Sequence, residues 1–288
     1  MKKVKLFLGI LSVLGILFAT ACQDLDNTND QQGNLVIKLT DAPFPIDMIE
    51  AATVNITKVE IRKRSEGNEE EYPFITVLGE SMEFNLLDLR NGITADLVDV
   101  KIEAGNYDLI RVYVDQAGIV VIGEEPYNLK VPSGPQTGIK IFIEPSLRVV
   151  GGLTTEVLLD FNVEKSFILK GNMDSPAGIK GFNFKPVIRA VNNTTAGTVD
   201  GMVMNSDTAL EFAYVLMEQV VEQDTFEITS ASTDEAGYYA MPGVPAGLYS
   251  LSATLDGFDT VTFEGVEVVE GNLTVQNFTL TKLEEPVE

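Results

Sequence analysis

Carboxylate side chains are the residues of this 288-residue chain that could do chemistry, because other common catalytic groups are missing or rare. The sequence holds 43 Asp and Glu, but no His, no Trp and one Cys. A Ser/His/Asp triad, a Cys/His dyad, a histidine zinc site and a histidine general base each need a residue that is absent or nearly so. The composition therefore predicts carboxylate or lysine chemistry, or no catalysis.

Three aspartates are candidates for a calcium or substrate site. Asp41 lies in a Thr-Asp-Ala-Pro segment directly after an alternating apolar run, and Asp47 and Asp160 could join it. Calcium prefers carboxylate and carbonyl oxygens, so such a cluster suits it. The alternative is a local role, in which the Asp41 carboxylate caps backbone N–H groups of a turn.

A loop from Pro132 to Gly138 supplies a second set of candidate ligand-binding side chains. It contains Ser133 and Thr137, and Lys140 stands on the strand that follows. The loop lacks the G-x-x-x-x-G-K-[ST] spacing of a phosphate cradle, so a long hairpin loop is predicted. Polar side chains on such a loop could still bind a ligand.

Paired carboxylates could also run glycoside hydrolysis. Among 43 acidic residues, some pair lies at a suitable distance by chance, and the absence of Trp removes the largest aromatic face for a sugar ring. A carboxylate-dependent glycan hydrolase is therefore an alternative rather than the first hypothesis.

Charge and hydrophobic content restrict the partners and the class of protein. The net charge is -23, which argues against nucleic acid, because phosphate binding needs clustered Lys and Arg. The hydrophobic content is 45%, which is typical of a folded protein and too high for a disordered acidic chain.

The first 22 residues have the three regions of a secretory signal. Basic residues at Lys2, Lys3 and Lys5 precede an uncharged apolar run from Leu6 to Ala21, and Cys22 follows. With small residues before its cysteine, the segment resembles a bacterial lipoprotein signal. That resemblance implies removal of residues 1–21 and acylation of Cys22, and several acyl chains anchor a protein stably where one does not.

Residues 22–32 form a polar, acidic segment that predicts a flexible, lipidated tether. Its acids after the cysteine resemble the signal that sends lipoproteins of Bacteroides-like bacteria to the cell surface. Asp207-Thr208-Ala209 and Asp259-Thr260-Val261 resemble the O-glycosylation acceptor of the same bacteria. These resemblances imply an outer-membrane, surface-exposed protein with Thr208 and Thr260 as modification points.

Short alternating apolar runs separated by Gly, Pro, Asn and Asp predict an all-β protein. Between Ala51 and Arg64 the apolar phase changes, which indicates a bulge near Thr57 and Lys58. Leu86, Leu87 and Leu89 fit either a short helical turn or the end of a strand. The polar run Asn192 to Gly197 predicts a boundary between two β-sandwich domains.

The second domain, residues 195–282, shows seven strand-like runs, as a seven-stranded sandwich requires. Its segments Thr233 to Tyr239, Gly243 to Tyr249 and Asp256 to Phe258 resemble the carboxypeptidase regulatory-like family. That resemblance implies a transthyretin-like sandwich without catalytic activity. Asp234 and Gly237 suit the first and last positions of a type I turn.

The first domain, residues 33–191, carries Leu39-Thr40-Asp41-Ala42-Pro43, Ala104 to Tyr107, Val131 to Lys140, Leu159 to Phe161 and Phe184 to Val187. Together these resemble a family of bacterial lipoprotein domains of unknown function, which supplies no activity. Ala104-Gly105-Asn106-Tyr107-Asp108-Leu109 echoes Ala246-Gly247-Leu248-Tyr249-Ser250-Leu251, which suggests related sandwiches in both halves.

The sequence thus predicts a non-catalytic, lipid-anchored cell-envelope protein of two β-sandwiches that acts as a binding, adhesion or assembly module. Its expected partners are the membrane, through the lipid, and an envelope glycan or protein. The alternatives are the glycan hydrolase above and an accessory subunit of an outer-membrane transporter.

Overall fold

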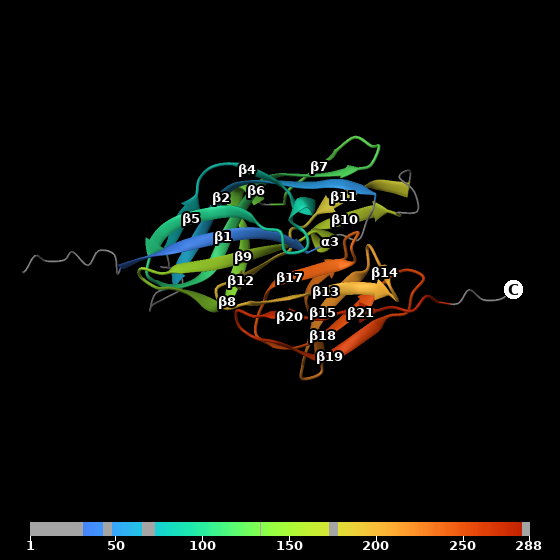
Figure 1. Ribbon diagram of the computed structural model, residues 1–288. Helices are drawn as coiled ribbons and strands as arrows, with labels where there is room; N and C mark the ends of the chain where they lie inside the picture. Colours follow the sequence, from blue (N-terminus) through green and yellow to red (C-terminus); the bar gives the residue numbers. More distant parts are fainter. Residues whose placement is uncertain (1–30, 43–47, 65–72, 133, 173–177, 284–288) are drawn as a thin grey trace, which may run out of the picture.

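The protein is described by a computed structural model that covers residues 31–42, 48–64, 73–132, 134–172 and 178–283. Cys22, Asp47 and Ser133 lie outside these residues. The described residues form mostly strands and very little helix, which confirms the all-β prediction. Two β-sandwiches lie side by side, with β1 to β12 in the upper one and β13 to β21 in the lower one (Figure 1).

The first sandwich packs a four-stranded sheet against a six-stranded sheet. The smaller sheet has the order β12 (Ile188–Asn192), β9 (Thr154–Asn162), β1 (Gln32–Ala42), β5 (Ala95–Glu103). The larger has the order β3 (Phe74–Leu78), β2 (Ile49–Arg64), β6 (Gly105–Val121), β7 (Tyr127–Leu129), with β4 (Met82–Asn85) on β2 and β8 (Ile139–Val149) on β6. Side chains that alternate along both sheets fill one buried cluster, as a sandwich core requires.

Short elements complete this sandwich. A two-stranded sheet joins β10 (Phe167–Gly171) to β11 (Ile179–Phe184). Single turns of helix among the described residues include η3 (Leu86–Leu89), α2 (Gly134–Thr137) and α3 (Val163–Ser166). The leucine run is therefore a helical turn, with Leu86, Leu87 and Leu89 all buried.

The second sandwich also has two sheets. One is β14 (Thr208–Ala209), β13 (Gly197–Asn205), β17 (Tyr238–Val244), with β20 (Leu273–Val275) and β21 (Phe278–Thr279) both on β13. The other has the order β16 (Asp224–Ser232), β15 (Tyr214–Val221), β18 (Gly247–Thr254), β19 (Val261–Val268). The seven predicted runs all contain strands, the last one divided into β20 and β21, and β14 is a two-residue addition.

Local sequence signals explain several of these elements. The register of β2 against β6 shifts on both sides of Ile56 and skips Thr57, which confirms the predicted bulge. Asp234 begins a turn in which its carbonyl accepts from Gly237 N–H at 2.8 Å, and Gly237 has a φ of 74° that favours glycine.

The repeated hexamer places the same tyrosine hydrogen bond in both sandwiches. The hydroxyl of Tyr107 donates to Glu103 O at 2.8 Å, and the hydroxyl of Tyr249 donates to Pro245 O at 2.8 Å. Each buried ring thus fixes the backbone four residues upstream, as in the tyrosine corner of β-sandwiches.

One local prediction is wrong. Residues 132–138 do not close a hairpin, because β7 and β8 do not pair with each other; both pair with β6. The opposite edge of β6 is occupied by β2, so β7 and β8 follow one another along the remaining edge, against Ala117–Ile119 and then Gly105–Val112. The segment between β7 and β8 therefore separates two stretches of pairing along the same edge of β6. Part of this segment forms α2.

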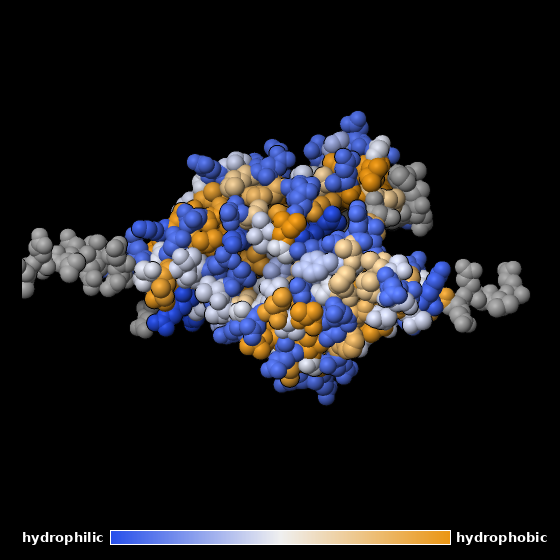
Figure 2. Space-filling model, viewed as in Figure 1, coloured by the Kyte–Doolittle hydropathy of each residue, from blue (hydrophilic) through white to orange (hydrophobic). Residues whose placement is uncertain are grey.

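The surface on the viewed face is mixed. Hydrophobic residues form separate patches among hydrophilic ones (Figure 2). No helix among the described residues combines the length and the apolar character needed to cross a membrane.

Candidate functional site

The two sandwiches meet at a seam that begins with the predicted aspartates. β1 and β9 pair in parallel, so that Thr40 lies opposite Asp160 and Asp41 lies opposite Phe161. Asp41 and Asp160 are therefore one position apart in register on neighbouring strands, near enough for the charge of Asp160 to act on Asp41, and both are buried, at 5% and 6% exposure. The structure brings together two of the three aspartates that the sequence analysis proposed as a cluster.

Asp160 joins the sandwiches through an arginine. Arg189 lies opposite it on β12, and its Nη2 is 2.8 Å from Asp160 Oδ2. The same oxygen accepts from the Thr229 hydroxyl of β16 at 3.2 Å, and Arg189 Nη1 donates to Gly243 O of β17 at 3.3 Å. Because Thr229 and Gly243 belong to the second sandwich, this pair holds the two units together.

Two further contacts extend the seam. Lys165 of α3 pairs with Glu227 of β16 at 2.6 Å, and the Tyr214 hydroxyl donates to Glu164 at 3.3 Å. Burial raises the pKa of Glu164 above its usual range, although its hydrogen bond to Tyr214 lowers it. A polar interface thus surrounds the buried Asp160.

Asp41 is held by a backbone group. Its Oδ1 accepts the N–H of Val163 at 3.3 Å, and its Oδ2 has no hydrogen-bond partner among the described residues. Burial, and secondarily the charge of Asp160, raises the pKa of Asp41 well above its usual range. The carboxylate thus caps a backbone N–H of α3, a segment 122 positions along the chain.

The calcium hypothesis stays a prediction. Within the described ranges, no group of three or more His, Cys, Asp or Glu is placed to hold a metal ion. Arg189 already supplies a positive charge to Asp160, which a calcium ion would otherwise do.

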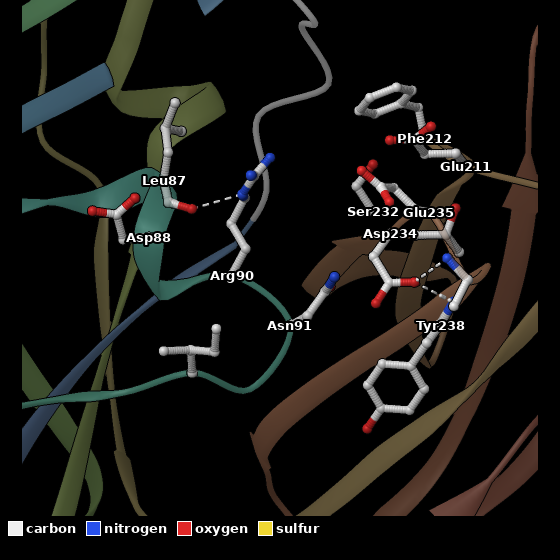
Figure 3. A pocket seen from close by; sticks show the side chains of 13 residues that line it. Leu87, Asp88, Arg90, Asn91, Glu211, Phe212, Ser232, Asp234, Glu235 and Tyr238 are labelled. Carbon is white, nitrogen blue, oxygen red and sulfur yellow. Dashed lines mark hydrogen bonds between the residues drawn. The ribbon is translucent and has the colours of Figure 1, made fainter. Parts of the chain in front are cut away.

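Beside the seam lies a cleft of about 790 Å³, which we call the interdomain cleft (Figure 3). One wall comes from η3 and the turn after it, and the other from the segment before β15, the end of β16 and the turn that leads into β17. The residues that line it are Leu87, Asp88, Arg90, Asn91, Ile93, Glu211, Phe212, Ser232, Thr233, Asp234, Glu235, Ala236 and Tyr238.

Thr40 of the Leu-Thr-Asp-Ala-Pro motif holds the first wall in place. Its buried hydroxyl lies 3.1 Å from Leu89 O and 3.0 Å from Ile93 O, which are the two ends of the loop. Within that loop, Asn91 has a φ of 54° and Gly92 a φ of 79°, as in a type I′ turn. Arg90 Nε donates to Leu87 O at 2.7 Å, which fixes the guanidinium group.

The second wall carries an unusual aromatic residue. Phe212 has a φ of 59°, a conformation that a bulky side chain rarely adopts, and its ring is about half exposed. Its N–H donates to Thr233 O at 3.0 Å, and Thr233 N–H donates to Ala213 O at 3.0 Å. Backbone strain of this kind clusters at binding sites.

Two residues of the lining carry a buried polar atom without a partner. Ser232 Oγ and Asn91 Oδ1 are both buried and make no hydrogen bond within the described part of the chain. A buried polar atom left unpaired costs about 1–3 kcal/mol. A ligand that pairs with these atoms would recover that energy.

The remaining predicted residues lie elsewhere. Thr137 and Lys140 are exposed near the start of β8, away from Asp41, and Lys140 lies opposite Arg111 in a hollow of about 610 Å³. Thr208 and Thr260 are exposed, as modification would require, and their glycosylation stays a prediction.

Sequence reasoning missed the residues that complete the seam and the cleft. Arg189 is a lone cation in an apolar strand, and its partners depend on pairings between distant segments. The Asn91-Gly92 pair is a recognisable turn signal, but its position against Asp234 depends on how the sandwiches meet. No sequence signal marks the left-handed conformation of Phe212.

Comparison with known proteins gives the following similarities. Among solved structures, the TIE protein of Bacillus anthracis is 15% identical at a TM-score of 0.25, over 88% of this chain and 34% of that one. A streptococcal ancillary pilin is 11% identical at 0.27, over 88% and 63%. The minor pilin GBS52 of Streptococcus agalactiae is 12% identical at 0.23, over 90% and 98%. The chain thus spans less than two thirds of the first two proteins.

No curated protein sequence matches the chain. Residues 198–281 match the carboxypeptidase regulatory-like domain, which confirms the resemblance seen in the second half. Residues 32–186, more than half of the chain, match a domain of unknown function. The chain therefore belongs to the family of that domain, DUF4382.

Proposed function

We propose that this protein is a non-catalytic, lipid-anchored component of the cell envelope that binds a ligand or partner in the interdomain cleft. The cleft itself carries this proposal, because recognition groups line it: a guanidinium at Arg90, an amide at Asn91, a hydroxyl at Ser232 and a half-exposed ring at Phe212. Ligand sites commonly combine such a concave surface with a few polar groups, and they occur between domains.

The groups in the cleft suit binding better than bond cleavage. Among the described residues that line the cleft, Ser232 carries the unpaired buried hydroxyl, and no base lies within hydrogen-bonding distance of it. A nucleophilic serine needs such a base. The lining therefore supports recognition.

The hydrolase alternative depends on a pair of accessible carboxylates. Burial pushes Asp41 toward its neutral form, as a general acid requires. Asp41 and Asp160 are nevertheless both buried in the seam, and Arg189 and Thr229 occupy Asp160 Oδ2. A sugar cannot reach them without separation of the two sandwiches.

An array of envelope glycans and peptides, probed with the purified protein, tests the proposal. Phe212→Gly removes the ring and suits the left-handed backbone, so it should abolish binding while the protein stays folded. Phe226→Ala, which removes an equally exposed ring from β16 outside the cleft, should leave binding unchanged. Release of a product from any bound glycan would contradict the non-catalytic role.

Co-purification tests the alternative of a transporter accessory subunit. A protein that serves in this way should purify with a barrel protein from solubilised membranes, independently of Phe212. The lipid anchor is tested separately by the Cys22 variant described in the Discussion.

A further inference from the structure

The charges of this chain are distributed unevenly between its two halves. Residues 192–288 hold 17 acidic residues and one basic residue, Lys282, a net charge of -16. Residues 33–191 hold 23 acidic and 16 basic residues, a net charge of -7. The second sandwich therefore creates a negative potential that attracts cations, most strongly where its surface is concave.

The interdomain cleft is concave and has this acidic wall. Glu211, Asp234 and Glu235 line it from the second sandwich, and all three are exposed. Asp234 Oδ1 accepts the N–H groups of Ala236 and Tyr238 at 2.9 Å each, and Figure 3 shows its other oxygen turned away from these bonds. That second oxygen can accept a hydrogen bond from a ligand.

An unpaired hydroxyl gives an independent sign of a ligand in the cleft. Ser232 is 7% exposed, and its Oγ has no partner within the described part of the chain. Across the cleft, the Asn91 side chain points toward Asp234 (Figure 3), and Asn91 Oδ1 is also unpaired. Carboxylates, this amide oxygen and this hydroxyl can all accept hydrogen bonds. The lining also holds one base, Arg90, whose Nε donates to Leu87 O, against the four acids Asp88, Glu211, Asp234 and Glu235. The excess of acids over bases favours a ligand rich in donors.

The arrangement of these acceptors disfavours a bound metal ion. No group of three carboxylates within the described ranges is placed to hold one, and the acids are distributed along a cleft of about 790 Å³. A ligand with several separate N–H donors fits such a distribution better. The exposed ring of Phe212 adds a face on which an ammonium or guanidinium group can lie.

We propose that the interdomain cleft binds a lysine- or arginine-bearing segment of a partner protein. This inference rests on the proposed binding role of the cleft and adds the chemistry of the occupant. Basic side chains pair with Glu211, Glu235 and the second oxygen of Asp234, and a donor of the same segment pairs with Ser232.

Fluorescence anisotropy with a labelled peptide of alternating Lys and Gly tests the proposal. The double variant Glu211→Gln/Glu235→Gln removes two charges from the cleft. The matched control Glu264→Gln/Glu267→Gln removes two exposed charges from β19, outside the cleft. Each ion pair contributes at most about 1 kcal/mol, so we expect the cleft variant to raise Kd roughly tenfold and the control less than twofold.

Two further measurements separate site binding from general attraction. Ser232→Ala changes no charge and should weaken binding severalfold, and the same peptide with acetylated lysines should lose most of its affinity. Equal weakening by the two double variants would mean a diffuse attraction and would overturn the proposal, as would undetectable binding of the lysine peptide.

The outcome also distinguishes this inference from the proposed function. Binding of a neutral glycan or peptide that Phe212→Gly abolishes would leave the binding role standing and overturn the cationic occupant. Thermal melts of all variants check that they remain folded, which is expected because the four Glu side chains are exposed.

Discussion

Replacement of Arg189 by Met should destabilise the protein far more than the loss of an ordinary ion pair. Arg189 is the cation of the buried Asp160 and also donates to Gly243 O of the other sandwich. Met keeps much of the aliphatic volume but removes the charge. Asp160 would then be buried with only the Thr229 hydroxyl as a described partner, close to Asp41.

The structure sets the size of the effect. Removal of one partner from a fully buried pair costs about 3–5 kcal/mol. The Asp160 side chain is 8% exposed and that of Arg189 27%, so water screens the pair in part and we expect about 2–3 kcal/mol. At about 2–4 °C per kcal/mol for a protein of this size, the Tm should fall by roughly 4–12 °C.

Differential scanning calorimetry at neutral pH measures this shift against a control on the same sheet. Lys38 and Glu156 pair at 2.9 Å with side chains 30% and 25% exposed, so Lys38→Met should cost at most about 1 kcal/mol. The double variant Asp160→Asn/Arg189→Met should recover much of the lost stability, because no uncompensated charge remains. A Tm for Arg189→Met equal to that of Lys38→Met would refute the role of the pair.

Three other predictions follow from the sequence and the seam. Asp41→Asn should raise the Tm at pH 8. The pKa of Asp41 is raised in the folded state, so the folded state loses stability as pH rises from the unfolded pKa of about 3.9 through the folded pKa. In melts across a pH series the gain in Tm should vanish below a pH of about 4, and a gain that does not depend on pH would contradict this origin. Cys22→Ser should release the protein from membranes into the soluble fraction, and retention on membranes would exclude the lipid anchor. Residues 195–288 expressed alone should show a cooperative thermal transition with a β spectrum, whereas a disordered product would show that this half needs the seam.

Much of the fold could be predicted because its signals are local. Alternation with a period of two identifies the strands, and the phase change in β2 locates its bulge at Thr57. The hexamers around Tyr107 and Tyr249 identify a shared corner because the ring bonds a carbonyl only four residues away. The path of β7 and β8 could not be predicted, since it depends on which edge of β6 the distant β2 occupies.

The candidate site was harder to predict because it exists only where distant segments meet. Asp41 and Asp160 were identified as candidate ligands, but the environment of Asp160 depends on the second sandwich, whose Thr229 hydroxyl bonds its carboxylate. Arg90 and Phe212 are about 120 positions apart in the sequence. No pattern within either segment indicates that they line one cleft.

The parallel pairing of the first strand in each sandwich has a consequence for the order in which the chain can fold. β1 pairs with β9, so Asn34 can make this pairing only after Thr154 has been made. β13 likewise pairs with β20, so Thr198 can make this pairing only after Leu273 has been made. Contacts between such distant residues give a high contact order, and the loops must close before the contacts can stabilise them. During synthesis from the N-terminus, β1 can pair only with β5 until residues 154–162 emerge, so neither sandwich can close before almost all of its chain is present.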